Sequence, residues 1–392
     1  MPSSSSKPLW INIIFLTGSP LLVLLLCPWY LYNYGLHAST FWTSICLWII
    51  SGMGITVGYH RLFSHRSFKA NVFVRVMALL AGAMALQNSA IIWSSDHRKH
   101  HRNVDHNIQD PYSISRGFFW AHIGWIFFET PENQVRNNVS DLWKDPLVSW
   151  QHRYYFPLAI ALNTCIPLGL GFVFGNIGEM LLFAGLAKIV FAHHFTFCIN
   201  SLAHIWGTQP WSSANSSRDN WMISLLTFGE GYHNYHHSFE TDYRNGPLWY
   251  NYDPSKWLIW CLEKIGFVSD LKKIPQERIF RCHYLERKTL SPSIEQFNSW
   301  YASAGEQQKE LVLYLKTRLE QTEITLEEKL SNLRETHRRW VEAKRNEINP
   351  EKWRQQLHQS QISTKQTLKE WDLLLEEYLQ ELQSIPPLLI SQ

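Results

Sequence analysis

The 392-residue sequence has six cysteines, and no two of them stand in a CxxC pair. A disulfide framework or a cysteine zinc site is therefore not expected. The chain also lacks a glycine-rich dinucleotide fingerprint, so no flavin- or nicotinamide-binding segment is recognisable. The formal net charge of +3 is too small to indicate binding to nucleic acid, and we expect no nucleic-acid partner.

Long apolar runs, by contrast, are frequent up to about residue 206. A membrane-spanning helix needs roughly 20 mostly apolar residues. We therefore predict four spans, at about 9–32, 39–59, 156–176 and 178–203. No small-residue cleavage site follows the first span, which predicts a retained helix rather than a signal peptide. A fifth stretch, 71–93, is short and bounded by polar boxes, and this predicts a helix that dips into or lies on the membrane.

The distribution of basic residues predicts the orientation of the four spans. Four spans place both termini on the same side of the membrane. The connections at 33–38 and at about 177 have almost no Lys or Arg, whereas the long loop after the second span is basic. Its basic residues include Arg61, Arg66, Lys69, Arg98, Lys99 and Arg102. The positive-inside rule then places this loop and both termini in the cytoplasm. We expect a multi-pass protein in contact with membrane lipid, in a bacterial inner membrane.

The predicted fold class is an all-α membrane protein with two parts. Residues 1–290 form a membrane domain whose cytoplasmic cap comprises 60–155 and 204–290, and residues 291–392 form a helical extension. In the extension, leucines recur at three- and four-residue steps from Leu311 to Leu333, which is typical of a coiled coil. Pro350 breaks this pattern before a second helix, about 351–384. Both a helical hairpin and a self-associating arm fit the extension.

Nine histidines stand in three boxes and at one isolated position. The boxes are His60-Arg-Leu-Phe-Ser-His65, His97-Arg-Lys-His100-His101 and His233-Asn-Tyr-His236-His237, and the isolated residue is His204, four residues after Asn200. Spacings of three and four residues place side chains on one face of a helix. All nine histidines fall on the predicted cytoplasmic side. A single box would also fit a surface histidine cluster, but three boxes on one side of a membrane indicate a metal centre.

The number and type of these side chains indicate two metal ions. Imidazole is the most common metal ligand among side chains, and nine imidazoles exceed what one ion can hold. Structural zinc sites close at four ligands, so a single zinc does not fit. None of the boxes contains a carboxylate, which excludes the Glu-x-x-His pattern of soluble di-iron bundles. Asn200 is a poor direct ligand that could hold a metal-bound water. Asp96, Asp110 and Glu230 could either orient imidazole N–H groups or simply cap helices.

At these residues the chain resembles the membrane fatty-acid desaturase family, and within it the delta-9 acyl-CoA (stearoyl-CoA desaturase-like) branch. The resemblance covers about residues 38–280. It rests on the motifs Gly54-Ile-Thr-Val-Gly-Tyr-His60, Asp96-His-Arg-Lys-His-His101, Asn200-Ser-Leu-Ala-His204, Gly229-Glu-Gly-Tyr-His233 and Asp242-Tyr-Arg-Asn-Gly246.

The resemblance implies a four-span fold with a cytosolic cap, a narrow acyl tunnel and a centre of two iron ions (Fe2+). It also implies that molecular oxygen is the co-substrate and that two hydrogens are removed from a saturated fatty-acyl chain to make a cis double bond. By motif position, the catalytic and metal-ligating residues would be His60, His65, His97, His100, His101, His204, His233, His236 and His237, with Asn200 acting through water.

Two departures from the family bear on its partners. Animal acyl-CoA members carry an Arg where Ser95 stands, so the substrate here could be an acyl-CoA, an acyl-ACP or an acyl-lipid. No cytochrome b5-like domain is recognisable in the chain. We therefore expect electrons from a separate carrier, a ferredoxin or a cytochrome b5-like protein.

Two other functions share part of this pattern. A membrane di-iron hydroxylase or ketolase also uses histidine boxes, but alkane-hydroxylase-like members carry a Glu-rich first box that is absent here. A metal transporter would place its ligands near the bilayer midplane rather than at one surface. For a desaturase we expect an apolar channel, with His193 and His194 near it. The candidate lining residues are Trp48, Ile50, Trp93, Trp120 and Trp125.

Overall fold

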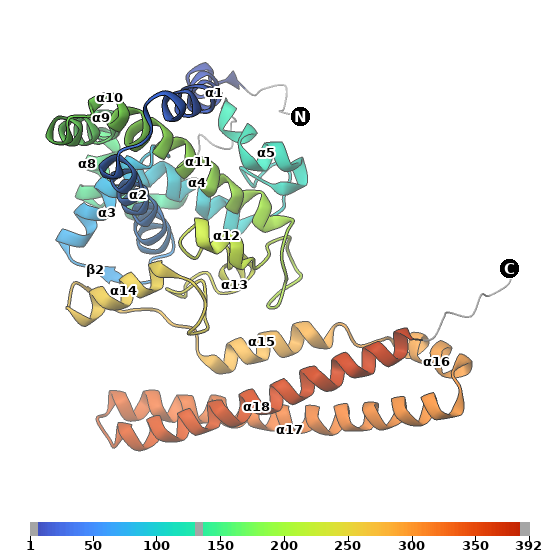
Figure 1. Ribbon diagram of the computed structural model, residues 1–392. Coiled ribbons are helices and arrows are strands. Elements are labelled where there is room, and N and C mark those ends of the chain that lie inside the picture. Colours follow the sequence, from blue (N-terminus) through green and yellow to red (C-terminus); the bar gives the residue numbers. More distant parts are fainter. Residues whose placement is uncertain (1–6, 130–135, 385–392) are drawn as a thin grey trace. The chain divides into compact units, whose positions relative to one another are not determined.

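The computed structural model describes residues 7–129 and 136–384. These residues form two compact units (Figure 1). One unit runs to Gln209 and includes Ser213–Lys273, and the other comprises Pro210–Ser212 and the chain from Ile274 onward. The division falls after Lys273, so helix α15 (Gln276–Lys288) groups with the C-terminal helices, whereas the sequence boundary was placed at residue 290.

Four helical segments of the first unit are long and apolar enough to cross a membrane. They are α1 (Trp10–Tyr34), α2 (Ala38–Met53) with its π-helical continuation Gly54–Ser64, α9 (Tyr155–Phe174), and the run Ile177–His204, which contains α10 (Ile177–Met180), the π-helical segment Leu181–Ala187, α11 (Lys188–Asn200) and the 3-10 turn Leu202–His204. The predicted all-α fold with four spans is confirmed.

Two of these segments are longer than a bilayer requires. The segments Ala38–Ser64 and Ile177–His204 have 27 and 28 residues. At 1.5 Å per residue each is about 40 Å long, against a hydrocarbon core of about 30 Å. Their last turns therefore project beyond the core. These projecting turns carry His60 and His204, which is how the membrane helices deliver histidines to one surface.

The fifth apolar stretch forms a shorter helix than the sequence indicated. Helix α3 spans Val72–Met84 and starts at Asn71, whose side chain accepts a hydrogen bond from the Val74 amide. The predicted helix over 71–93 is wrong after residue 84, because the backbone turns there through positive φ angles of 54° at Leu86 and 73° at Asn88. Helix α4 (Ala90–Arg102) then begins in a new direction, capped by Ser89.

Short helices and two small antiparallel sheets are the other elements of the first unit among the described residues. The remaining helices are α5 (Phe118–His122), α7 (Ser140–Trp143), α8 (Pro146–Arg153), α12 (Trp221–Leu226), α13 (His233–Ser238) and α14 (Pro254–Lys264), with 3-10 turns at Ile114–Arg116, Gly124–Phe127 and Asn137–Val139. Strand β1 (Lys7–Pro8) pairs with β3 (Phe128–Glu129), and β2 (Lys69–Ala70) pairs with β4 (Val268–Ser269). The second sheet joins the start of α3 to the residues after α14.

The C-terminal unit is a helical hairpin with two further helices. Helices α17 (Glu306–Arg345) and α18 (Pro350–Gln383) run side by side (Figure 1), and α16 (Ile294–Ser303) precedes them. Leu326, Leu330 and Leu375 are buried in their shared core. Helix α15 packs on this hairpin through the Tyr284 and Trp371 rings, whose centroids are 5.0 Å apart. The leucine pattern thus forms an intramolecular hairpin, and self-association of the extension stays a prediction.

The hairpin core can be tested with two leucines of the same helix. Leu375 is fully buried whereas Leu373 is 57% exposed. We expect Leu375→Ala to lower the unfolding free energy of the C-terminal unit by about 2–5 kcal/mol, because it leaves a cavity, and Leu373→Ala to change it by less than about 1 kcal/mol. Amide hydrogen exchange of α17 and α18 in the full-length protein measures both. Equal effects of the two substitutions would contradict the described packing.

Candidate metal centre

Four local structures present the nine histidines, and one of them is the 3-10 turn Leu202–His204, which carries His204. His60 lies in the π-helical segment, where hydrogen bonds join residues five apart, and the His65 amide donates to the His60 carbonyl at 3.0 Å. That winding brings the two rings to a centroid distance of 4.8 Å despite their five-residue spacing. Helices α4 and α13 carry the second and third boxes on single faces. The first box thus lies at the end of the second membrane segment, where the helix is π-helical and His65 follows its last residue.

The structure gathers the nine histidines into two groups. The first consists of five residues and the second of four, and within each group the candidate ligand atoms lie within 4.8 Å of one another. The first group is His60, His65, His97, His101 and His236, and the second is His100, His204, His233 and His237. Every histidine from the three boxes and His204 belongs to one group, so the arrangement has the form of a two-ion centre.

Within each group the Nε2 atoms point at one another. In the first group, Nε2–Nε2 distances are 2.9 Å for His60 and His236, 2.8 Å for His65 and His97, and 2.9 Å for His236 and His101. In the second group they are 3.2 Å for His100 and His237, 3.1 Å for His233 and His204, and 3.0 Å for His237 and His233. Two nitrogens bound at right angles to one ion, each about 2.1 Å from it, would lie roughly 3.0 Å apart.

Polar groups hold several of the opposite ring nitrogens. His100 Nδ1 lies 2.9 Å from Asp110 Oδ1, and His60 Nδ1 lies 2.8 Å from Glu230 Oε2. His204 Nδ1 lies 2.7 Å from the Ser216 hydroxyl, which donates to Asp105. A neutral imidazole whose Nδ1–H donates to a carboxylate presents an unprotonated Nε2. The Nε2 lone pairs thus face one another inside the protein.

This arrangement fits metal ions better than it fits hydrogen bonds among imidazoles. Burial lowers the pKa of His97, His233, His236 and His237 well below 6.5, so these rings are neutral near pH 7. Clustered lone pairs in a buried site repel each other unless a cation lies between them. The residues present therefore fit two metal ions, one for each group.

A buried ion-pair network supports the first group from behind. The Arg61 guanidinium contacts Glu230 and Asp253, each at 3.0 Å, and all three side chains are buried. Burial alone would raise the pKa of Glu230, but His60 and Arg61 beside it lower that pKa below its ordinary value. The Glu230 carboxylate stays ionised as a result. Its negative charge beside His60 Nδ1 favours the proton on that nitrogen and leaves Nε2 free to bind a metal.

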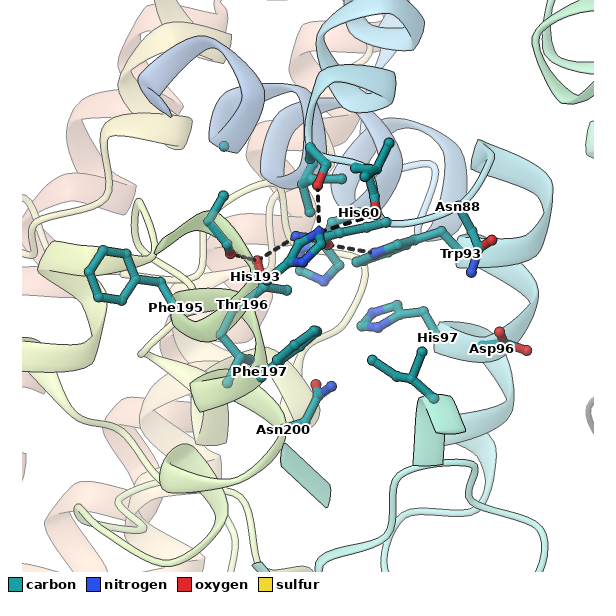
Figure 2. A pocket seen from close by; sticks show the side chains of 18 of the residues that line it. His60, Asn88, Trp93, Asp96, His97, His193, Phe195, Thr196, Phe197 and Asn200 are labelled. Atoms are coloured by element: carbon teal, nitrogen blue, oxygen red, sulfur yellow. Dashed lines mark hydrogen bonds between the residues drawn. The ribbon is translucent and has the colours of Figure 1, made fainter. Parts of the chain in front are cut away.

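A cavity of about 440 Å³ opens onto both groups. Its polar end is lined by His60 and His97 from the first group, by His100 and His233 from the second, and by Asn200. Figure 2 shows Asn200 at the end of α11, facing the same space as His97 and Trp93. The rest of the lining is mainly apolar and comes from the membrane helices. An apolar molecule that enters this cavity can therefore reach the histidines.

The three carboxylates near the histidine boxes have different partners. The sequence left both imidazole support and helix capping open for three carboxylates. Asp110 and Glu230 lie beside imidazoles, whereas Asp96 faces Arg136 and Lys99. Burial raises the pKa of Asp96 to about 6, against the opposing effect of Arg136 and Lys99. Asp96 thus belongs to an ion-pair cluster rather than to the imidazole supports.

The predicted channel lining is right for three of its five residues. Trp48, Trp93 and Trp125 line the cavity, as does His193, whose Nε2 lies 3.0 Å from the Ala85 carbonyl (Figure 2). The prediction is wrong for Trp120, which donates to the Pro111 carbonyl, and for Ile50, which faces outward from α2. His194 pairs with His122 at 3.1 Å.

Sequence reasoning missed three contacts of the imidazoles. Glu240 lies 3.3 Å from His101 Nδ1, the Tyr112 hydroxyl lies 3.3 Å from His97 Nδ1, and Ser216 contacts His204. Glu240 follows the third box closely and could have been suspected. Nothing in the spacing of Tyr112 or Ser216 marks them, because their loops reach the site only through tertiary packing.

Comparison with known proteins places this geometry in a family. The Fatty acid desaturase family model matches residues 38–257. The chain is 40% identical over 272 residues to a probable acyl-CoA desaturase of Schizosaccharomyces pombe, and this match covers 69% of the chain and 56% of the relative. It is 39% identical over 275 residues to acyl-CoA desaturase 1 of Saccharomyces cerevisiae, covering 69% of the chain and 53% of that relative. The match thus spans little more than half of each yeast protein.

A cyanobacterial relative is covered more completely. The chain is 33% identical over 277 residues to an sn-2 palmitoyl-lipid 9-desaturase of a Nostoc species, which covers 68% of the chain and 92% of that protein.

The support given by Asp110 can be measured through metal affinity. We expect Asp110→Asn to weaken metal binding by roughly 10- to 100-fold, because the His100 ring loses the carboxylate that orients it. Metal content after competition with a graded series of chelators measures this change. Asp270→Asn serves as the control, since Asp270 is exposed and pairs with Lys69 away from the histidines. Unchanged affinity in Asp110→Asn would contradict the role of this contact.

The lowered histidine pKa values predict how the metal-free protein responds to acid. Burial lowers the pKa of His101 from 6.5 to about 4. Between these two pKa values the unfolded chain binds a proton at His101 and the folded chain does not. The contribution of His101 to the unfolding free energy is therefore complete above pH 6.5 and falls as the pH is lowered toward 4. We therefore expect the midpoint temperature of thermal unfolding of the metal-free protein to fall as the pH is lowered from about 7.5 to about 4.5. A midpoint that rises on acidification would contradict the buried neutral rings.

Proposed function

The chain belongs to the fatty acid desaturase family, and from that premise we propose that it introduces a cis double bond, at the delta-9 position, into a saturated fatty-acyl chain. One observation carries the proposal. Two groups of histidines lie at the polar end of a cavity whose other walls are apolar and come from membrane helices. An acyl chain that enters this cavity from the membrane would bring its methylene groups to the histidines.

We propose iron as the metal and the nine histidines as its ligands. The first group would hold one Fe2+ with five imidazoles and the second would hold the other with four, so the second has fewer ligands. Asn200 lines the same cavity as His100 and His233 of this second group and is proposed to act through a water molecule. When bound, two iron ions supply the oxidising chemistry with molecular oxygen that removal of hydrogen from an unactivated methylene requires. Two substrate hydrogens, two further electrons and two protons together convert one oxygen molecule to two waters.

The role of the protein's own residues is to hold the acyl chain in a dry, shaped space. The Trp93 ring stacks on His97 with a centroid distance of 4.9 Å, so it covers one side of that imidazole. Gly52 permits the close approach of the Phe228 ring, because a Cβ at this position would lie 2.1 Å from its nearest ring carbon. These contacts close the wall of the cavity next to the histidines and exclude water there.

Polar groups in the cavity wall satisfy one another. The Gln87 amide donates to the Thr196 hydroxyl at 2.9 Å, and Trp93 Nε1 donates to the Gln87 carbonyl oxygen at 3.4 Å. A buried polar group without a partner would attract water into the cavity. Because the groups of Gln87, Thr196 and Trp93 are paired, they do not draw water to this part of the wall.

The head group and the electron donor are parts of the same proposal. Ser95 is buried and donates to Asn138 at 2.8 Å, so no charged side chain stands where animal acyl-CoA members have an Arg. An acyl-CoA, an acyl-ACP or an acyl-lipid therefore has to be held elsewhere. We propose a separate ferredoxin or cytochrome b5-like donor, and a bacterial inner membrane with both termini in the cytoplasm. The cytoplasmic side is favoured because reduced carriers are available there.

A histidine of the first group provides the test of function. We expect His97→Ala to reduce double-bond formation to background while the protein still inserts into the membrane, because the first group loses one of its five imidazoles. His106→Ala is the matched control, since His106 is an exposed loop residue outside both groups and should retain activity. Fatty-acid profiling by mass spectrometry in a host that lacks the product measures both variants.

The same measurement separates the alternative function. A hydroxylase or ketolase would add oxygen to the fatty-acyl product, whereas a desaturase removes two hydrogens. Full desaturation in His97→Ala, or an oxygenated product from the unmodified protein, would overturn the proposal.

A further inference from the structure

Helix α14 carries apolar side chains on its outward side as well as on its inward side. Its buried residues are Ser255, Lys256 and Ile259. The Ser255 hydroxyl lies 2.7 Å from the Thr56 hydroxyl and donates to the Phe228 carbonyl at 2.9 Å. The Lys256 ammonium donates to the carbonyls of Gly246 and Leu248, each at 2.7 Å. A helix whose outer side faces water carries polar side chains on that side.

The outward side of α14 carries large apolar side chains. Trp257 is 44% exposed, Trp260 is 50% exposed, and Ile265 just after the helix is 63% exposed. Trp257, Trp260 and Lys264 share one face at helical spacing. The Lys264 ammonium lies 5.5 Å from the centre of the Trp260 ring, so its stem runs beside the indole and its charge lies at the edge of the apolar surface. Tryptophan with a neighbouring lysine is typical of the membrane–water interface.

Helix α3 continues the same apolar surface. Its residues Val72, Phe73 and Met77 are exposed, and the Phe73 ring lies 5.9 Å from the ring of Phe267, which follows α14. The β2–β4 sheet joins the two helices, because Ala70 pairs with Val268. The exposed apolar residues of α3, α14 and 265–267 thus form one surface, which we call the α3–α14 surface.

The position of α14 along the second membrane segment sets its depth. Thr56, the partner of Ser255, is 18 residues after Ala38, where that segment begins. At 1.5 Å per residue this is about 27 Å along the helix, close to the full thickness of a hydrocarbon core of about 30 Å. Helix α14 therefore starts where the membrane helix leaves the hydrocarbon. An apolar surface at this depth meets lipid, not bulk water.

We propose that the α3–α14 surface inserts into the boundary between the lipid head groups and the acyl chains, on the membrane face that carries the histidines. The occupant of this surface is the bilayer itself, as for a monotopic amphipathic helix. Inserted in this way, α14 lies in lipid and contacts Phe228, whose carbonyl accepts a hydrogen bond from the Ser255 hydroxyl. Phe228 also lines the cavity. This proposal rests on the membrane helices and not on the chemistry of the metal centre.

Photo-crosslinking in lipid nanodiscs of phosphatidylcholine tests the proposal on the full-length protein. The photoreactive residue p-benzoylphenylalanine replaces Trp260 in one variant, Leu24 in a second and Asn107 in a third. Leu24 is 69% exposed on the membrane helix α1 and reports lipid, whereas Asn107 is exposed in a loop after the second histidine box and reports water. We expect lipid adducts at positions 260 and 24 and none at 107. No lipid adduct at 260, or a crosslink from 260 to a second copy of the chain, would overturn the proposal.

A measurement on the unmodified residue of α14 guards against effects of the replacement. Cys261 is exposed on the outward side of α14. In nanodiscs, a charged maleimide should label Cys261 on the order of tenfold more slowly than it labels the cysteine of Asn107→Cys, because the charged reagent enters the acyl region poorly. Peptide mass spectrometry reads each site separately. Equal labelling rates would show that water reaches α14 and would contradict the proposal.

Discussion

The convergence of nine imidazole Nε2 atoms is the interaction on which the rest of the first unit depends. Burial lowers the pKa of His97, His233, His236 and His237 and keeps these rings neutral, so protons do not separate the nitrogen lone pairs. Cations placed between them would relieve the repulsion, and the division into five and four histidines would give each of two ions its own group. The carboxylates and hydroxyls on the opposite ring nitrogens then have a single purpose, which is to hold each ring with its Nε2 toward the ion.

Two membrane segments are long enough to carry histidines from the hydrocarbon core into the cap. A helix that ended at the edge of the hydrocarbon would leave its last residues away from the cap. The segments ending at Ser64 and His204 are longer than the core, and the π-helical winding of the first one turns His60 and His65 to the same side. Arg61 sits between them in sequence and points the other way, into its ion pairs with Glu230 and Asp253. One stretch of chain thus carries His60 and His65 and also Arg61, whose ion pairs hold Glu230 and Asp253 behind these histidines.

The bilayer acts as the solvent for much of this unit. The placement of polar and apolar side chains in it is therefore different from that in a protein surrounded by water. Inside the cavity, Gln87, Thr196 and Trp93 bind one another, so that the surface offered to an acyl chain is apolar. On the outside, α14 buries Ser255 and Lys256 and presents tryptophans outward. Both arrangements would be unfavourable in water, and both become favourable when one side of the element faces hydrocarbon.

Local composition and spacing along the chain are enough to predict the four spans, the three histidine boxes and the family. Asp110 and Glu230 were candidates for imidazole support because they lie close to the boxes in sequence or in motif. Packing between distant segments, in contrast, sets which histidines share a group, brings Ser216 and Tyr112 to imidazoles, and pairs Asp96 with Arg136. The same holds for the turn at Leu86 and Asn88, which ends the predicted helix early, and for the outward-facing tryptophans of α14. These features arise from contacts between segments far apart in the chain, and neither periodicity nor spacing within one segment carries information about what will pack against it.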